Sequence, residues 1–112
     1  MKVTELRIGN FVKYQNAIIE VNYIIESSVG FGNGIKFLYE PSYQFEPIEL
    51  TEEWLLKFAF EKKTHTFVKY PLSIKCQSKY FYYVKTRLEI KYIHQLQNLY
   101  FALTNEELTI KE

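Results

Sequence analysis

The sequence predicts an α+β fold, with an N-terminal curled antiparallel sheet, a short helix, a second antiparallel meander and a closing C-terminal helix. Three observations indicate this class. Short β-prone segments separated by turn residues fill residues 1–50 and residues 61–90. Residues 51–60 open with a helix-capping threonine, and apolar residues recur at helical spacing over residues 91–103. Strands and helices that are grouped in this way, rather than alternating, predict antiparallel sheets covered by helices.

The chain is long enough for one compact domain. It has 112 residues, of which 47% are hydrophobic and 24% are charged, as in ordinary globular proteins. These values exclude a disordered tail, a collagen-like chain and a small disulfide-stapled protein. We therefore expect residues 1–112 to form a single domain, whose unusual feature is an aromatic content of 18%.

The first 50 residues predict a small β subdomain. Four segments between turn residues are rich in Ile, Val, Tyr and Phe: residues 11–14, 18–25, 35–39 and 43–45. The glycine-rich segment 27–34 predicts a loop. The opening LRIGNFVKY resembles the first strand of Src-homology-3-like small barrels, which implies a backbone bent at Gly9 with Ile8 and Val12 directed inward.

Two helices are predicted in the second half of the chain. Thr51 is a suitable N-cap for a helix over residues 51–60, and the two glutamates that follow it lie where the helix dipole favours negative charge. Residues 91–103 carry an apolar stripe and form the closing helix. We expect Leu96 and Leu103 to anchor this helix in the core.

Residues 61–90 predict a β-meander of three or four strands with an aromatic centre. Tyr80–Val84 is almost entirely aromatic, and side chains alternate between the two faces of a strand. Because Phe has no hydroxyl group to satisfy, we expect Phe81 to point inward, which sends Tyr80 and Tyr82 outward.

The basic residues are concentrated in the middle of the chain. Residues 57–91 carry nine basic and two acidic groups, whereas residues 1–56 carry four basic and eight acidic groups. A basic segment between acidic ones is either a binding face or the side that pairs with the acidic segments of the same molecule.

The basic, aromatic centre supplies the candidate contact residues. Three interpretations stay open: a tyrosine-lined structural sheet, a protein contact, or a site for nucleic acid or a nucleotide, in which rings stack on bases and cations hold phosphates. The candidate residues are Lys69, Lys75, Lys79, Tyr80, Tyr82, Lys85 and Arg87.

Motifs of catalysis and of metal or phosphate binding are not found in the sequence. Cys76 is the only cysteine and alternates with apolar residues, which predicts a buried thiol. The two histidines, His65 and His94, lack the paired spacing of metal ligands, and the GFGNG segment lacks the Lys-Ser/Thr of a phosphate-binding loop. The sequence therefore predicts a protein without enzyme activity, cofactor or metal.

The cysteine usage and the hydropathy pattern predict a cytoplasmic protein. A single cysteine fits a reducing compartment. The opening MKVTELRIGN has no apolar segment of signal-peptide length, and no stretch reaches the roughly 18 apolar residues of a membrane helix.

Three segments together resemble one protein family. LRIGN, PIELTEEWLLKFAFEKK and IKYIHQLQNLYFALTNEELTI are similar, in this order, to a family of small uncharacterised proteins from Bacteroidetes and from their phages and prophages. The resemblance implies no catalytic residues. It implies a mobile-element context. In that context we expect an accessory protein that binds and modulates a host or phage protein in the host cytoplasm, as inhibitors of host defence systems do. The alternative function is binding of nucleic acid or a nucleotide through the basic, tyrosine-rich sheet face.

Overall fold

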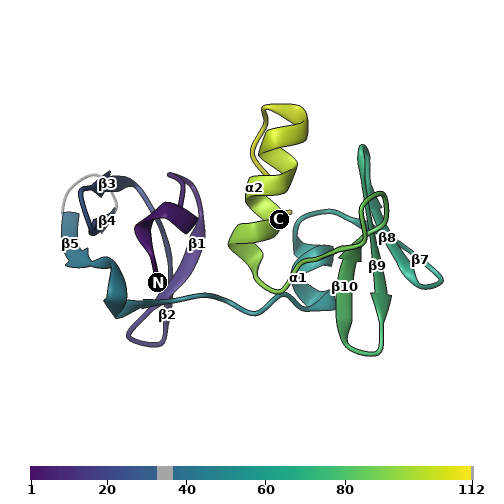
Figure 1. Cartoon of the computed structure of the whole chain (residues 1–112), viewed down its shortest axis with the longest axis horizontal. Coiled ribbons are helices and arrows are strands. Elements are labelled where there is room, and N and C mark those ends of the chain that lie inside the picture. Colours follow the sequence, from purple (N-terminus) through teal and green to yellow (C-terminus); the bar gives the residue numbers. More distant parts are fainter. Residues whose placement is uncertain (33–36, 112) are drawn as a thin grey trace. The chain divides into compact units, whose positions relative to one another are not determined.

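The computed structural model describes residues 1–32 and 37–111 and has the α+β class that the sequence predicts. The chain divides into two compact units, Met1–Ile48 and Glu49–Glu112, called here the N-terminal and C-terminal units (Figure 1). Among the described residues, the strands form two three-stranded sheets and one five-stranded sheet, all antiparallel, and none of the three closes into a barrel. The single-domain organisation of residues 1–112 stays a prediction, so each unit is described by itself.

The N-terminal unit contains two three-stranded sheets, with strand orders β2-β1-β6 and β3-β4-β5. Its strands are β1 (Phe11–Tyr14), β2 (Ala17–Glu20), β3 (Tyr23–Ile25), β4 (Ser28–Gly32), β5 (Phe37–Pro41) and β6 (Phe45–Glu46), and its 3₁₀ turns are η1 (Val3–Glu5) and η2 (Ser42–Gln44). The predicted strand 43–45 is thus mostly the turn η2. Strand β4 occupies part of the segment 27–34 that was expected to be a loop, and residues 33–36 lie outside the described residues.

The predicted strand 18–25 is two strands, because the chain passes from one sheet to the other in its middle. The Val21 N–H donates to the Asn10 carbonyl at 2.8 Å, and the Val21 carbonyl accepts from the Gly9 N–H at 2.7 Å, which continues the β1–β2 ladder. The next residue, Asn22, donates its N–H to the Gly30 carbonyl of β4 at 2.8 Å. Val21 and Asn22 therefore connect the two sheets.

The core of the N-terminal unit is formed by Leu6, Val12, Val21, Val29 and Phe45. The rings of Tyr14 and Phe31 lie against Phe45, with ring centroids 5.2 and 5.7 Å away. Val12 points inward as predicted. The prediction for Ile8 is wrong, since its side chain is 56% exposed.

A tight turn around Gly9 explains the exposure of Ile8. Gly9 has a left-handed φ of 99°, and Asn10 is buried. The Asn10 side-chain oxygen accepts from the Arg7 N–H at 2.7 Å, while the Asn10 N–H donates to the Arg7 carbonyl at 3.0 Å. These bonds close a turn over residues 7–10, which directs Ile8 toward solvent.

The C-terminal unit contains a five-stranded meander and two helices (Figure 1). The strand order β11-β10-β9-β8-β7 follows the sequence, and the helices are α1 (Glu52–Lys57) and α2 (Ile93–Thr104). The strands are β7 (Glu61–Lys63), β8 (Thr66–Lys69), β9 (Leu72–Gln77), β10 (Tyr80–Tyr83) and β11 (Leu88–Glu89). The meander therefore has one strand more than the upper number predicted.

Helix α1 is shorter than the predicted helix over residues 51–60. It begins as predicted, because the Thr51 hydroxyl accepts from the Trp54 N–H at 3.4 Å. It ends at Lys57 because Ala59 adopts a left-handed φ of 67°, which no α-helix continues through.

The inner face of the sheet and one side of α2 supply many of the buried residues of the C-terminal unit. The inner sheet face carries Phe67, Leu72, Ile74, Phe81 and Tyr83, which are all buried. Lys69 lies on this face by register, and its Nζ is 6.0 Å from the centroid of the Tyr100 ring of α2. Helix α2 therefore lies on the inner side of the sheet.

The chain segments that enter and leave the helices are tied together by backbone bonds. The Leu50 N–H donates to the Lys91 carbonyl at 2.8 Å, just before α1 and α2 begin. After α2 the chain turns at Asn105, whose φ is 59°, and the Lys111 N–H donates to the Lys57 carbonyl at the end of α1. Leu108, within this returning segment, is buried.

The prediction that Leu103 anchors α2 in the core is wrong, whereas the prediction for Leu96 is confirmed, since its side chain is fully buried. Leu103 lies one residue before the end of α2 and is 44% exposed.

We expect Leu96→Ala to lower the free energy of unfolding by about 2–5 kcal/mol, because it opens a cavity in the core. The same change at Leu103 is expected to cost less than about 1 kcal/mol, and urea unfolding of the two variants measures both. Equal losses would contradict the burial described here.

The Tyr14 hydroxyl group gives the N-terminal unit a pH dependence. Desolvation and the neighbouring Glu40 carboxylate raise the pKa of Tyr14 above its ordinary value of 10.0. The protonated hydroxyl therefore stabilises the folded chain fully below that pH, and this stabilisation is lost as the pH rises through the higher pKa of the folded state. We expect the stability difference between the wild type and Tyr14→Phe to stay constant up to about pH 9 and to shrink above about pH 10 in urea unfolding. A difference that stays constant would contradict this assignment.

Candidate binding surface

The outer face of the five-stranded sheet carries the tyrosines that the sequence placed outward. Cross-strand pairing aligns Lys63, Thr66, Lys75, Tyr82 and Glu89 in one row across the strands. Because side chains alternate along a strand, the whole row projects from the face opposite the buried one.

The alternation predicted for β10 is confirmed. Tyr80 is 52% exposed, whereas Phe81 and Tyr83 are 8% and 7% exposed. Phe81 lies opposite Cys76 on the inner face, and Tyr83 lies opposite the fully buried Ile74. The outward rings of Tyr80 and Tyr82 lie next to each other, with centroids 6.4 Å apart and planes inclined at 44°.

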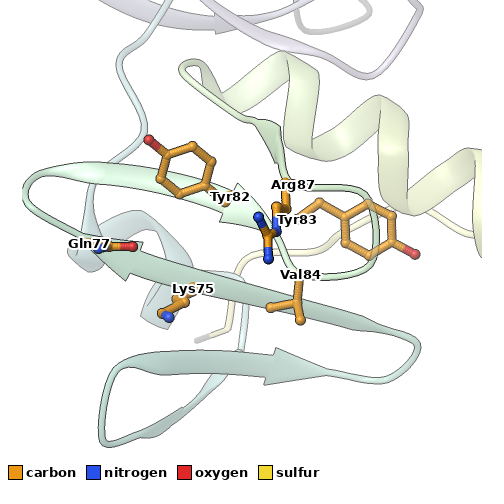
Figure 2. A pocket seen from close by; sticks show the side chains of 6 residues that line it. All are labelled: Lys75, Gln77, Tyr82, Tyr83, Val84 and Arg87. Atoms are coloured by element: carbon orange, nitrogen blue, oxygen red, sulfur yellow. The ribbon is translucent and has the colours of Figure 1, made fainter.

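An open pocket of about 450 Å³ lies at the end of β10 (Figure 2). Strand β9, strand β10 and the turn between β10 and β11 each contribute two of its side chains. The lining residues are Lys75, Gln77, Tyr82, Tyr83, Val84 and Arg87. In Figure 2 the Arg87 guanidinium group is turned toward the space between Tyr82 and Val84.

Hydrogen bonds within the β10–β11 turn position Arg87. Its N–H donates to the Tyr83 carbonyl at 2.8 Å, and its φ of 58° is left-handed. At the start of the turn, the Val84 N–H donates to the Ser73 carbonyl of β9 at 3.0 Å. The Thr86 hydroxyl oxygen accepts from the Leu88 N–H at 3.3 Å. The turn is thus bonded at both ends, and Arg87 projects from a defined backbone.

The pocket is positively charged. Lys75 and Arg87 are its charged lining residues, and no carboxylate is among the six. Within the described residues neither cation forms an ion pair, and both are exposed. Glu89 is separated from Lys75 by Tyr82 in the cross-strand row. Cations that are not neutralised in a concave surface attract anionic groups.

Part of the basic segment is neutralised within the molecule. Lys57 Nζ lies 3.5 Å from the Glu53 carboxylate, and Lys62 pairs with Glu52. Both acidic partners come from the acidic segment 1–56. One part of the basic segment therefore pairs with acidic residues of the same molecule, and another part is left as a candidate binding face. Lys57 and Lys62 pair internally, whereas the pocket cations form no ion pair with the part of the chain that the structure describes.

A second, smaller hollow of about 340 Å³ adjoins the pocket. Its lining residues are His65, Lys75, Cys76, Gln77 and Ser78. Lys75 and Gln77 line both hollows. Cys76 is partly exposed here rather than buried, because it lies near the end of β9, close to the turn at Ser78-Lys79.

The structure gathers three of the seven candidate residues into the pocket: Lys75, Tyr82 and Arg87. Tyr80 lies beside them on the outer face. Lys79 and Lys85 lie in the turns at opposite ends of β10, and both are exposed.

Lys69, another of the seven candidate residues, does not lie on the outer face. Its register partner is the buried Leu72, so it lies on the inner face near Tyr100. Sequence reasoning also missed Gln77 and Val84 as lining residues. Gln77 was detectable, because it follows Lys75 by two positions on the same strand and so shares its face.

Neither a group of metal ligands nor a similar known protein identifies a function for the site. Within residues 1–32 and 37–111, no three His, Cys, Asp or Glu side chains gather into a metal-binding group. No helix in the same residues has the length and apolar character needed to cross a membrane. Comparison with protein-family models, curated proteins and solved structures gave no match to the chain. The resemblance to the phage and prophage family therefore stays a prediction.

Tyrosine nitration tests the orientation of β10. We expect Tyr80 to be nitrated faster than Tyr83 in the folded protein, because Tyr80 is 52% exposed and Tyr83 only 7%. Both tyrosines lie between Lys79 and Lys85, so one tryptic peptide reports both rates by fragment-ion mass spectrometry. Unfolded protein serves as the control, in which the two rates are expected to become similar. Faster nitration of Tyr83 in the folded state would reverse the assigned faces.

Proposed function

We propose that this protein is a non-enzymatic binding module that contacts a partner protein through the outer face of its five-stranded sheet. The carrying observation is that Tyr82 and Arg87 line one open pocket and that the exposed Tyr80 ring lies next to Tyr82. Tyr and Arg are the residue types that contribute most energy at the centres of protein interfaces. The contact surface is defined here as the β10 surface, which consists of Lys75, Gln77, Tyr80, Tyr82, Val84 and Arg87.

Exposed apolar groups support a protein contact. Val84 is 47% exposed, and the side chain of Tyr80 presents half of its area to solvent. Covering such groups removes apolar surface from water, at about 25 cal/mol per Å². The pocket gives a partner side chain a place to insert, and buried anchors of this kind account for most of the affinity of protein interfaces.

The charge of the β10 surface favours an acidic partner. Lys75 and Arg87 have no carboxylate beside them in the pocket, so a partner carboxylate would neutralise them without displacing an internal ion pair. Complementary charge of this kind raises the association rate and selects the partner.

The composition of the two hollows supports a binding role rather than catalysis. Neither set of lining residues includes a carboxylate, so neither hollow offers the paired carboxylates of acid/base chemistry. Cys76 and His65 line the smaller hollow together, but the contact between them is a backbone bond, from the Cys76 N–H to the His65 carbonyl at 2.9 Å.

The biological setting that we propose rests on the resemblance of three segments to a family from Bacteroidetes and their phages. In this setting the protein is a mobile-element accessory protein in the host cytoplasm. Its partner is a host or phage protein, and inhibition of a host defence system is the proposed outcome of binding.

Affinity capture tests the protein-binding proposal. We expect the tagged protein to retain a host or phage protein from a Bacteroidetes lysate after nuclease treatment. With the purified partner, Tyr82→Ala and Arg87→Ala are each expected to weaken binding by about tenfold or more, the loss typical of interface anchors.

Tyr43→Ala is the matched control for the tyrosine change. Tyr43 is 76% exposed and belongs to the N-terminal unit. We expect this variant to bind as the wild type does. A loss at Tyr43 together with full binding by Tyr82→Ala would contradict the β10 surface as the contact site.

Single-stranded nucleic acid is the second candidate partner, because tyrosine rings lie beside cations that carry no internal carboxylate. In this case affinity falls steeply between about 50 and 200 mM salt, whereas an apolar protein contact changes little. Lys75→Ser with Arg87→Ser is expected to weaken oligonucleotide binding without loss of stability, since both side chains are exposed. No binding of a single strand by the wild type at about 50 mM salt would end this candidate.

A further inference from the structure

We infer that the β10 pocket is a site for a nucleoside monophosphate, held by Lys75 and Arg87 at its phosphate and by Tyr82 at its base. This inference rests on the β10 surface being a binding surface, but not on the partner being a protein. A free nucleotide and the terminal nucleotide of a strand present the same chemistry to such a pocket.

Charge makes the phosphate the group that the pocket selects. Lys75 reaches the pocket from β9 and Arg87 from the β10–β11 turn, so two elements supply one cation each. Arg presents a planar fork of donors that matches two phosphate oxygens, and Lys adds a compact charge. Among residues 1–32 and 37–111, neither group has a carboxylate partner to give up when the phosphate binds.

The remaining lining supplies contacts for a flat, aromatic base. Tyr82 is partly exposed and lines the pocket, and Val84 lines it beside Arg87. A base that stacks on a tyrosine ring gains affinity whatever its sequence identity. Gln77 contributes an amide that both donates and accepts, as the edge of a base requires.

The volume of the pocket and the fixed backbone position of Arg87 fit a ligand larger than a bare anion. The pocket volume of about 450 Å³ lies within the range of small-molecule sites. The bonded turn fixes the backbone of Arg87. The backbone of this contact group is thus preorganised, which lowers the entropy cost of binding.

The surrounding cations provide a test of location. Lys79 and Lys85 are exposed on the same sheet but do not line the pocket. If positive charge alone attracted nucleotides, these lysines would contribute as much as the pocket cations. If the pocket is the site, only Lys75 and Arg87 matter at short range.

Titration calorimetry at about 50 mM salt tests the inference with adenosine monophosphate, inorganic phosphate, adenosine and a single-stranded decanucleotide as probes. We expect the monophosphate to bind with a Kd of about 1 mM or lower, and inorganic phosphate to bind at least about fivefold more weakly because it lacks the base. Lys75→Gln with Arg87→Gln is expected to weaken binding by about tenfold or more. Lys79→Gln with Lys85→Gln removes the same net charge and is expected to change it by less than about threefold.

A second matched pair tests the stacking contact. Tyr82→Leu is expected to remove most of the advantage of the monophosphate over phosphate, whereas Tyr70→Leu, at an exposed tyrosine outside the β10 surface, retains it. The decanucleotide separates the two sources of ligand. Tighter binding of the strand than of the mononucleotide, with competition between them, assigns the site to a strand end, and equal or weaker binding assigns it to a free nucleotide. Circular dichroism of every variant confirms that it is folded.

Three results would overturn the inference. The first is no binding of the monophosphate by the wild type, and the second is an equal loss in the two double-glutamine variants. The third is equal affinity for inorganic phosphate and the monophosphate. A partner protein whose capture is weakened by Tyr82→Ala would still support the protein-binding proposal in each case, so the two proposals fail separately.

Discussion

The inward position of Phe81 determines which side chains of β10 reach solvent. A strand repeats every two residues, so burial of Phe81 also buries Tyr83 and exposes Tyr80 and Tyr82. A slip of one residue in the register would place two tyrosine hydroxyls in the core and expose a phenylalanine ring. Burial of the Phe81 side chain is worth about 1.5–3 kcal/mol, which opposes such a slip. The tyrosine surface is therefore a consequence of core packing on the other side of the same strand.

The features that could be predicted from the sequence are those set by local periodicity. The alternation in β10 and the apolar stripe of α2 each depend on residues close together in the chain, so their patterns indicated the right faces. Lys69 shows where such reasoning ends. The face on which Lys69 lies is set by the pairing of β8 with β9, in which Lys69 is opposite the buried Leu72. The number of basic residues in the segment gives no information about that strand register.

Other differences come from long-range contacts. The passage of the chain from one sheet to the other at Val21 and Asn22 depends on partners at Asn10 and Gly30, which no local pattern specifies. Helix α2 carries its stripe as far as Leu103, yet the returning segment after Asn105 places Leu108 in the core while Leu103 stays exposed. The pocket itself combines two strands and a turn. The sequence therefore indicated its residue types but not its position.

The position of Cys76 gives the protein an internal reporter group. It is the only cysteine in the chain, and it lines the hollow that shares Lys75 and Gln77 with the pocket. A thiol-reactive fluorophore would thus attach at a single position, next to two residues that also line the pocket. Its reaction rate and its emission are expected to respond to an occupant that contacts Lys75 or Gln77, without an engineered label site.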